Sequence, residues 1–471
     1  MGGLYLKMSR VMYVNTYLKR CNTSCAPMDE RNRQILHIAL PSIISNITVP
    51  LLGLVDVTIV GHLGAASYIG AIAVGGMLFN IIYWLFAFLR MGTGGMTSQA
   101  YGRRDFPEVI RLLLRALLIG LLLGISFILL QYPLCQVALT LIAPPTAEVE
   151  ALTRTYFRIC IYGAPAMLGL YGLTGWFIGM QNSRSPMWIA IVQNVTNILC
   201  SLLLVYGLGM KVEGVALGTL IAQYAGFLTA LLLFLRYYGR LGRYLPKPLL
   251  SMQTLRSVCH RQAMSRFFSV NRDIFLRTLC LVAVTLFFTS AGAAQGEIIL
   301  AVNTLLMQLF TLYSYIMDGF AFAGEALSGR FIGARHAEAF HSTVRHLFGW
   351  GLVMTILFTL TYALGGSAFL RLLTSEEAVI AAAATYFPWA LLIPVCGVAA
   401  FIWDGIYIGA TATRGMLLSM AIASATFFLL YATLHNSWGN HALWFSFLAY
   451  LTQRGVVQTL LRRRMVYQKV A

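Results

Sequence analysis

GWFIGMQNSR, residues 175–184, and GIYIGATATR, residues 405–414, are two versions of one motif within a chain of 471 residues. Their glycines and terminal arginine recur at an offset of 230. AYGRRD at 100–105 and FIGARH at 331–336 form a second related pair, with an offset of 231. Nearly equal offsets at two distant places indicate that the chain arose by internal duplication.

The composition is that of a membrane protein. Hydrophobic residues make up 59% of the chain and charged residues 11%, against about 25% charged residues in a soluble domain. Each membrane crossing needs roughly 20 apolar residues, and such runs recur along the whole chain. They predict twelve helices, at 36–60, 68–99, 112–142, 155–181, 186–210, 213–237, 270–293, 297–330, 343–374, 380–411, 416–438 and 440–462.

These observations predict an all-α polytopic membrane protein in which twelve transmembrane helices form two pseudo-symmetric bundles of six. Each half has an even number of crossings, so the repeat is parallel, and a pair of such bundles suits alternating access. We expect these divisions: an N-terminal extension at 1–30, an N-lobe at 31–237, a linker at 238–269, a C-lobe at 270–464 and a tail at 465–471. Met28 is a plausible natural start, and residues 1–27 are then an upstream extension.

The net charge of +18 lies mostly in one set of connections. Arg and Lys crowd the loops at 101–111, 181–184, 236–272, 329–336 and 462–464, and are nearly absent from those at 143–150, 210–214, 291–297 and 374–378. The positive-inside rule places the first set and both termini in the cytoplasm. This placement explains the charge without nucleic-acid binding, which we do not expect.

Asp56 is the outstanding ionisable residue, because it sits in VPLLGLVDVTIVGHLG (49–64) with no basic residue close in sequence. Charged groups in membrane helices are costly and usually functional. A carboxyl removed from water binds a proton more readily, so Asp56 is a candidate to take up and release protons, or to bind a small cation. The alternative is a structural role, in which Asp56 bonds to another helix. The repeat equivalent of Asp56 is Phe287.

Other polar residues fall at the same depth of the first half. Asn194, Asn197 and Ser201 share one face of the fifth helix because they are three and four residues apart. Thr219 on the sixth helix and Tyr156 on the fourth complete a candidate site with Asp56. Pro41 precedes Asp56 in the first helix by fifteen residues, and a proline there permits a kink.

The second half carries further acids within apolar runs. Asp318 and Glu325, seven residues apart, share a helix face, and Asp404 lies in FIWDGIYIG at 401–409. Two roles remain open for them: ion pairs with Arg272, Arg330 or Arg414, or a site for a cationic substrate. Arg272 and Asp273 stand together where the seventh helix is expected to begin.

No enzyme motif is found in the sequence: there is no Walker A sequence, no HExxH and no paired Asp-rich motif. We therefore expect a secondary transporter without a cofactor, driven by an ion gradient. Two alternatives remain, a flippase for lipid-linked precursors and, more remotely, a membrane-embedded transferase. The intramembrane ionisable residues are expected to be mostly acidic, which disfavours an anionic lipid diphosphate.

From about Arg31 to Arg464 the chain resembles the multidrug and toxic compound extrusion (MATE) family. The opening helix with Pro41 and LVDVTIVGHLG resembles the family signature, and NRDIFLRT (271–278), AVNTLLMQLF (301–310), YIMDGFAFAGEALSGRFIGAR (315–335) and WDGIYIGAT (403–411) resemble its DinF-like branch. The resemblance implies two lobes in a V shape and export of organic, cationic or amphipathic compounds by antiport with protons or sodium.

By motif position, Asp56 falls on the family's coupling aspartate, Pro41 on the proline whose kink has been linked to it, and Asn197 on an asparagine of the same site. Thr219 and Tyr156 fall on further oxygen-bearing positions. Relatives commonly carry an aspartate four residues after that asparagine, where this chain has Ser201. The missing acid favours proton over sodium coupling, although sodium at Asp56, Asn197 and Thr219 stays open. From the resemblance, we expect the protein to be a monomer in the bacterial inner membrane.

Overall fold

A computed structural model describes residues 28–61, 65–142, 146–244 and 256–470. Most of the predicted extension at 1–30 and the middle of the predicted linker at 238–269 lie outside the described residues. So does the last residue of the predicted tail.

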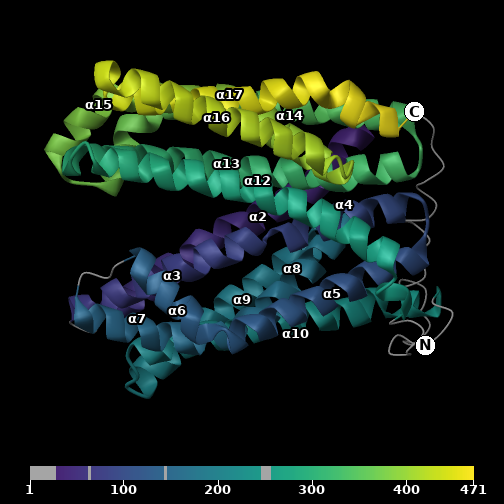
Figure 1. The fold of residues 1–471 in the computed structure, drawn as a ribbon, viewed down its shortest axis with the longest axis horizontal. Helices are drawn as coiled ribbons and strands as arrows, with labels where there is room; N and C mark the ends of the chain where they lie inside the picture. The colour runs from purple at the N-terminus through teal and green to yellow at the C-terminus, as the bar shows by residue number, and fades with distance from the viewer. Residues whose placement is uncertain (1–27, 62–64, 143–145, 245–255, 471) are drawn as a thin grey trace.

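The described chain forms two helical bundles (Figure 1). The first contains α2 (Met28–Gly61), α3 (Ala66–Phe86), α4 (Phe88–Gly102), α5 (Phe106–Leu129), α6 (Gln131–Ile142), α7 (Ala147–Cys160), α8 (Ala164–Gly179), α9 (Arg184–Leu202) and α10 (Val212–Tyr238). The second contains α12 (Arg261–Ala293), α13 (Glu297–Gly333), α14 (Ala337–Leu373), α15 (Glu377–Gly409), α16 (Thr413–Trp438) and α17 (Asn440–Met465). Short helical turns lie at η2 (Ile161–Gly163), η3 (Leu203–Gly207), η4 (Gly239–Tyr244) and η5 (Tyr467–Lys469).

Three of the predicted spans are divided helices, made of α3 with α4, α5 with α6, and α7 with α8. Counted in this way, the described chain runs twelve times between two ends of the molecule, as predicted. Nine helices among the described residues are long and apolar enough to cross a membrane. The other three runs are α2, α7–α8 and α17. Of these, α17 is polar because it carries Arg454, Gln458 and the arginines at 462–464.

Several helices begin earlier than apolarity predicts, because their first turns are polar and capped. α5 begins at Phe106 rather than at 112: Asp105 caps it by accepting a hydrogen bond from the Glu108 amide at 3.1 Å, and Pro107 follows in the first turn. α7 begins at Ala147 rather than at 155, where Thr146 accepts from the Val149 amide. A hydropathy pattern finds the apolar run, whereas the cap determines where the helix begins.

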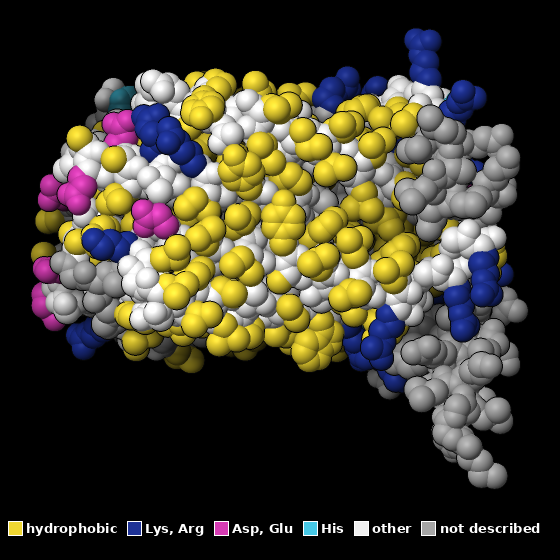
Figure 2. Space-filling view, turned by 90° about the horizontal axis from the view of Figure 1, so that it is seen from below, with side chains coloured by type: hydrophobic (Ala, Val, Ile, Leu, Met, Phe, Trp, Pro, Cys, Tyr) yellow, Lys and Arg dark blue, Asp and Glu magenta, His cyan; other side chains and the backbone are white. Residues whose placement is uncertain are grey.

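The charge asymmetry expected from the loops is present on the surface (Figure 2). A broad apolar belt separates one end, where Asp and Glu gather, from the other, where most of the visible Lys and Arg lie. We call the end where α2 begins and α17 ends the basic end, and the other the acidic end. Glu148, Glu213, Glu297 and Glu377 all lie in the first turn of helices that start at the acidic end.

The duplicated motifs end helices in the same way in both bundles. The described residues other than glycine with positive φ are Arg104 (60°), Gln181 (65°), Arg335 (52°) and Thr411 (47°). They form two pairs at the offsets of the repeat. Each closes a helix at the basic end with the two hydrogen bonds of a left-handed C-cap, for example Asn182 N to Phe177 O and Gln181 N to Ile178 O.

The glycines of the duplicated motif let helices within each bundle touch through their backbones. A β-carbon on Gly175 of α8 would lie 2.1 Å from the Arg90 carbonyl of α4, and one on Gly405 of α15 would lie 2.1 Å from the Ala321 carbonyl of α13. Arg90 and Ala321 are themselves 231 residues apart. Small residues spaced in this way allow the close helix packing that drives association in membranes.

The two bundles meet at the basic end and diverge toward the acidic end, which gives the V shape that the resemblance implies (Figure 1). A β-carbon on Gly102 would lie 2.1 Å from the Arg330 carbonyl, and one on Gly333 would lie 2.1 Å from the Gln99 carbonyl. Gln99 also donates to the Gly409 carbonyl at 2.9 Å, and Gln181 donates to the Ala326 carbonyl at 2.7 Å. At the basic end, helices of the two bundles therefore touch through backbone atoms.

Candidate functional site

In the first bundle, four helices bring most of the predicted site residues together. Asn197 of α9 donates to the Thr219 hydroxyl of α10 at 3.1 Å. The Tyr156 side chain of α7 interacts with both Thr219 and Asp56 of α2, and its ring packs on Gly75. Ser201 packs against Gly218, the neighbour of Thr219. We call Asp56, Tyr156, Asn197, Ser201 and Thr219 the Asp56 cluster.

The Asp56 cluster has oxygen atoms to spare. Asp56 is 7% exposed and faces the bundle interior, and it forms no ion pair with any described residue. Its Oδ1, together with Asn197 Oδ1 and Ser201 Oγ, is buried without a hydrogen-bond partner. Buried polar atoms are nearly always satisfied, so this group of oxygens is suited to receive a proton or a small cation.

Asn194 does not join this cluster. Its side-chain amide donates to the Thr48 carbonyl of α2 at 3.1 Å, eight residues before Asp56 in the chain. The three residues on this face of α9 therefore make different contacts. Asn197 and Ser201 belong to the Asp56 cluster, whereas Asn194 bonds to the middle of α2.

Pro41 lies within α2, which is helical on both sides of it. Because proline has no N–H, the carbonyl four residues earlier, that of His37, loses its helical partner. The hydroxyl of the fully buried Ser183, in the turn between α8 and α9, donates to this carbonyl at 3.1 Å. The role of Pro41 in gating stays a prediction.

We expect Ser183→Ala to lower the melting temperature of the purified protein by a few degrees. Removing the donor breaks its hydrogen bond to the His37 carbonyl, at a cost of about 0.5–1.5 kcal/mol. The matched control is Thr426→Ala, which removes an exposed hydroxyl that bonds only within its own helix, to the Ile422 carbonyl. Equal melting temperatures for both variants would show that Ser183 is dispensable.

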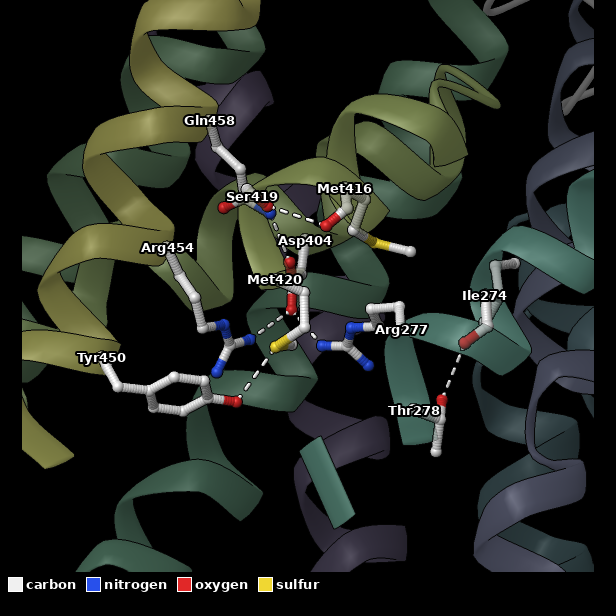
Figure 3. Close-up of polar contacts among 10 residues, drawn as sticks. All are labelled: Ile274, Arg277, Thr278, Asp404, Met416, Ser419, Met420, Tyr450, Arg454 and Gln458. Carbon is white, nitrogen blue, oxygen red and sulfur yellow. Dashed lines mark hydrogen bonds and ion pairs between the residues drawn. The ribbon is translucent and has the colours of Figure 1, made fainter. Parts of the chain in front are cut away.

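In the second bundle, Asp404 of α15 is the centre of a buried charged cluster (Figure 3). Arg277 of α12 and Arg454 of α17 both donate to its Oδ2, the latter at 2.6 Å, and Gln458 donates to Oδ1 at 2.6 Å. Both carboxylate oxygens are therefore occupied by cationic or amide donors. Asp318 of α13 lies near enough to Arg277 and Arg454 to interact with them electrostatically.

Glu325 of α13 is fully buried and pairs across the two bundles. Its Oε2 lies 3.5 Å from Arg90 Nη1 of α4, and its Oε1 packs onto Gly94, where a β-carbon would lie 1.9 Å away. The Arg90 guanidinium also stacks over the Phe322 ring at 4.2 Å. Gly94 is the repeat equivalent of Glu325. Because Gly94 has no side chain, it leaves space for the side chain of Glu325.

The ion-pair partners expected from the sequence were wrong for two of the three acids. Glu325 and Asp404 pair with Arg90, Arg277 and Arg454, not with Arg272, Arg330 or Arg414. The expectation that the intramembrane ionisable residues are mostly acidic was also wrong, since these three arginines balance Asp318, Glu325 and Asp404. Among the expected partners, Arg272 bonds to its neighbour Asp273 at 3.1 Å.

Arg277 and Arg454 lie inside predicted helices, so their position within apolar runs was a signal that sequence reasoning passed over. Asp273 lies near the basic end, where the Thr413 hydroxyl donates to its Oδ2 at 3.0 Å, and it joins neither cluster. Among the described residues, no group of three or more His, Cys, Asp or Glu is placed to hold a metal ion.

Two duplicated six-helix bundles, one with an unpaired buried acid and the other with a neutralised charged cluster, define a polytopic membrane protein with the architecture of a transporter. The chain belongs to the MATE family of secondary transporters, which are not enzymes: the MatE family model matches it twice, at residues 41–203 and 274–433. The two matches correspond to the two halves of the duplication.

Among known proteins, the chain is 38% identical to DNA damage-inducible protein F of Escherichia coli (strain K12) over 434 residues, which cover 92% of each chain. It is 26% identical to the multidrug export protein MepA of Staphylococcus aureus over 206 residues, 43% of this chain and 45% of MepA. A MATE crystal structure in the bent conformation superposes with a TM-score of 0.81 at 18% identity, covering 94% of this chain and 98% of the other. The last comparison establishes the fold.

Proposed function

We propose that the protein exports organic compounds, cationic or amphipathic in character, across the bacterial inner membrane, in exchange for protons bound and released at Asp56. The basic end faces the cytoplasm in this proposal, as the positive-inside rule requires, and the monomer is the working unit. The export function named for MepA of Staphylococcus aureus supports the direction of transport.

One observation carries the proposal: Asp56 is buried in the bundle, with Oδ1 unsatisfied and no cationic partner among the described residues. A buried carboxyl of this kind binds a proton more readily than one in water. Proton binding removes its charge, and the change alters how Asp56 interacts with Tyr156 and the rest of the cluster. In the second bundle, Asp404 already has two arginine partners, Arg277 and Arg454.

Proton coupling is favoured over sodium coupling because the Asp56 cluster holds a single carboxylate. Asn197, Ser201 and Thr219 supply neutral oxygens, and the Asn197–Thr219 hydrogen bond already occupies the Thr219 hydroxyl. Sodium bound at Asp56, Asn197 and Thr219 remains the alternative ion, and the transport experiment separates the two.

We expect Asp56→Asn to abolish gradient-driven transport while the protein remains folded. The protein is reconstituted in liposomes, and movement of a fluorescent organic cation such as ethidium is followed under an imposed pH gradient, a sodium gradient or neither. Only the pH gradient should drive transport by the parent protein. Asparagine keeps the shape of aspartate but cannot carry the proton, so the driven rate should fall at least tenfold.

The matched control is Glu377→Gln, which neutralises an exposed acid at the same end of the molecule. It should transport like the parent. Transport by Asp56→Asn at the parent rate under the pH gradient would remove Asp56 from coupling. Transport by the parent under the sodium gradient alone would replace the proton by sodium.

A further inference from the structure

A cavity of about 1050 Å³ opens at the basic end of the second bundle. It lies where α12 begins, where α15 turns into α16, and where α17 ends. Its volume is at the upper end of the range of small-molecule sites, about 300–1,000 Å³. The cationic side chains that line it come from all of these elements: Arg261, Arg266, Arg414, Arg464 and Lys469. We call this space the basic cavity.

The positive charge of the basic cavity is not balanced by the protein. Asp273 is the acid among its lining residues, and both of its oxygens are engaged, Oδ1 by Arg272 and Oδ2 by the Thr413 hydroxyl. The four lining arginines form no ion pair with a described acid. Like charges gathered in one concave site raise its affinity for an anion.

Backbone groups add to this field. α12 and α16 both begin at the cavity, and neither of their N-caps, His260 and Ala412, contributes a side-chain cap. The first amides of a helix carry partial positive charge and are suited to bind anions. Ser265 and Ser269 add two hydroxyl groups to the cavity lining.

The positive charge of Lys469 is disfavoured in the basic cavity. Its ammonium donates to the Ala410 and Thr411 carbonyls at 2.9 and 3.0 Å. Partial removal from water and, after it, the positive charge of Arg266 lower the pKa of Lys469 to about 8. A positive charge that is disfavoured in this way would be stabilised by an anion bound beside it.

We propose that the basic cavity is a binding site for a phosphate group, held by its arginines and by the amides of the two helix starts. Guanidinium groups match the geometry of phosphate oxygens and bind them in bidentate fashion. The cavity lies at the basic end of the molecule, where the phosphate can belong to an anionic phospholipid headgroup or to a soluble polyphosphate. Basic pockets between membrane helices bind such headgroups in other proteins.

The test uses the purified full-length protein and two probes. Inorganic pyrophosphate binding is measured by calorimetry in detergent at low salt, and phosphatidylglycerol binding by native mass spectrometry, with phosphatidylcholine as the neutral reference. The site variant is the double substitution Arg266→Gln with Arg414→Gln. The control is Arg240→Gln with Arg243→Gln, which removes the same charge from η4 of the first bundle at the same end.

We expect saturable binding of at least one probe by the parent, a loss of at least tenfold in affinity in the site variant, and a change of less than twofold in the control. Binding of phosphatidylglycerol alone identifies a lipid site, and binding of pyrophosphate alone a soluble ligand. Absence of binding by the parent overturns the proposal, as does an equal loss in both double variants, which would indicate general surface charge.

Lys469→Gln is the second variant, chosen to keep the arginines in place. It should weaken binding of the same probe and remove the pH dependence of affinity near pH 8. The other charged groups that line the cavity with Lys469 are Arg261, Arg266, Arg414, Arg464 and Asp273, and His260 lies beside them. Unchanged affinity and pH dependence in this variant would contradict the proposal.

Discussion

Gly333→Leu should open the basic end of the molecule. In the structure, a β-carbon at this position would lie 2.1 Å from the Gln99 carbonyl of the other bundle, and the Gln99 Cα and C atoms are also within reach. These are backbone atoms that cannot turn aside. Overpacking in a fixed core costs about 1–3 kcal/mol or more, and separating the two bundles relieves it completely.

Spin labels report this change. They are introduced by Arg240→Cys on the first bundle and Gln468→Cys on the second, after the eight native cysteines are replaced. Both positions are exposed at the basic end. The distance between the two labels is measured by double electron–electron resonance. For the parent, we expect the short distance to be the major population. For Gly333→Leu, the long distance should become the major population.

Gly349→Leu is the control, because a β-carbon at Gly349 of α14 meets nothing within 4 Å. It adds the same side chain to the same bundle without touching the other, so the short distance should be retained. Identical distance distributions in Gly333→Leu and the parent would show that this backbone contact does not hold the bundles together. Gly102→Leu, from the other half of the duplication, should repeat the effect against the Arg330 carbonyl.

Asp404→Asn should destabilise the protein more than any other neutralisation of an acid. It leaves Arg277 and Arg454 facing each other inside the second bundle with no carboxylate between them (Figure 3). Breaking a buried ion pair by removing one partner costs about 3–5 kcal/mol, because an uncompensated charge stays buried. We expect the melting temperature to fall by roughly 10 °C, measured by tryptophan fluorescence at a fixed scan rate.

A second substitution distinguishes charge imbalance from loss of packing. Arg454→Gln, added to Asp404→Asn, removes one of the two unpaired cations and should recover part of the lost stability. The double-mutant cycle then gives a coupling energy of opposite sign to the single losses. Glu377→Gln, an exposed acid of the same helix, should leave the melting temperature unchanged. If the double variant melts below Asp404→Asn, charge balance is not what Asp404 supplies.

The sequence by itself determined the class of fold and its duplication. Apolar runs of membrane length and charge-sorted loops predict the helices, because both follow from the local chemistry of short segments in a bilayer. The repeated strings also predicted where the two halves correspond, and the paired left-handed caps at Arg104 and Arg335 follow that correspondence. All five residues of the Asp56 cluster were named from the sequence, and helical spacing aligned Asn197 with Ser201, whereas Asn194, named with them, does not join the cluster.

Only the tertiary structure decided which charges meet. Arg90 reaches Glu325 from the other bundle, and Asp404 draws its arginines from helices 127 and 50 residues away. The basic cavity likewise brings together side chains from segments that the hydropathy pattern shows only as separate loops. Ion pairing depends on distances between helices, and helix packing sets those distances through backbone contacts such as that of Gly405 on Ala321. Periodicity fixes the face that a residue occupies, but it carries no information about the helix that this face meets.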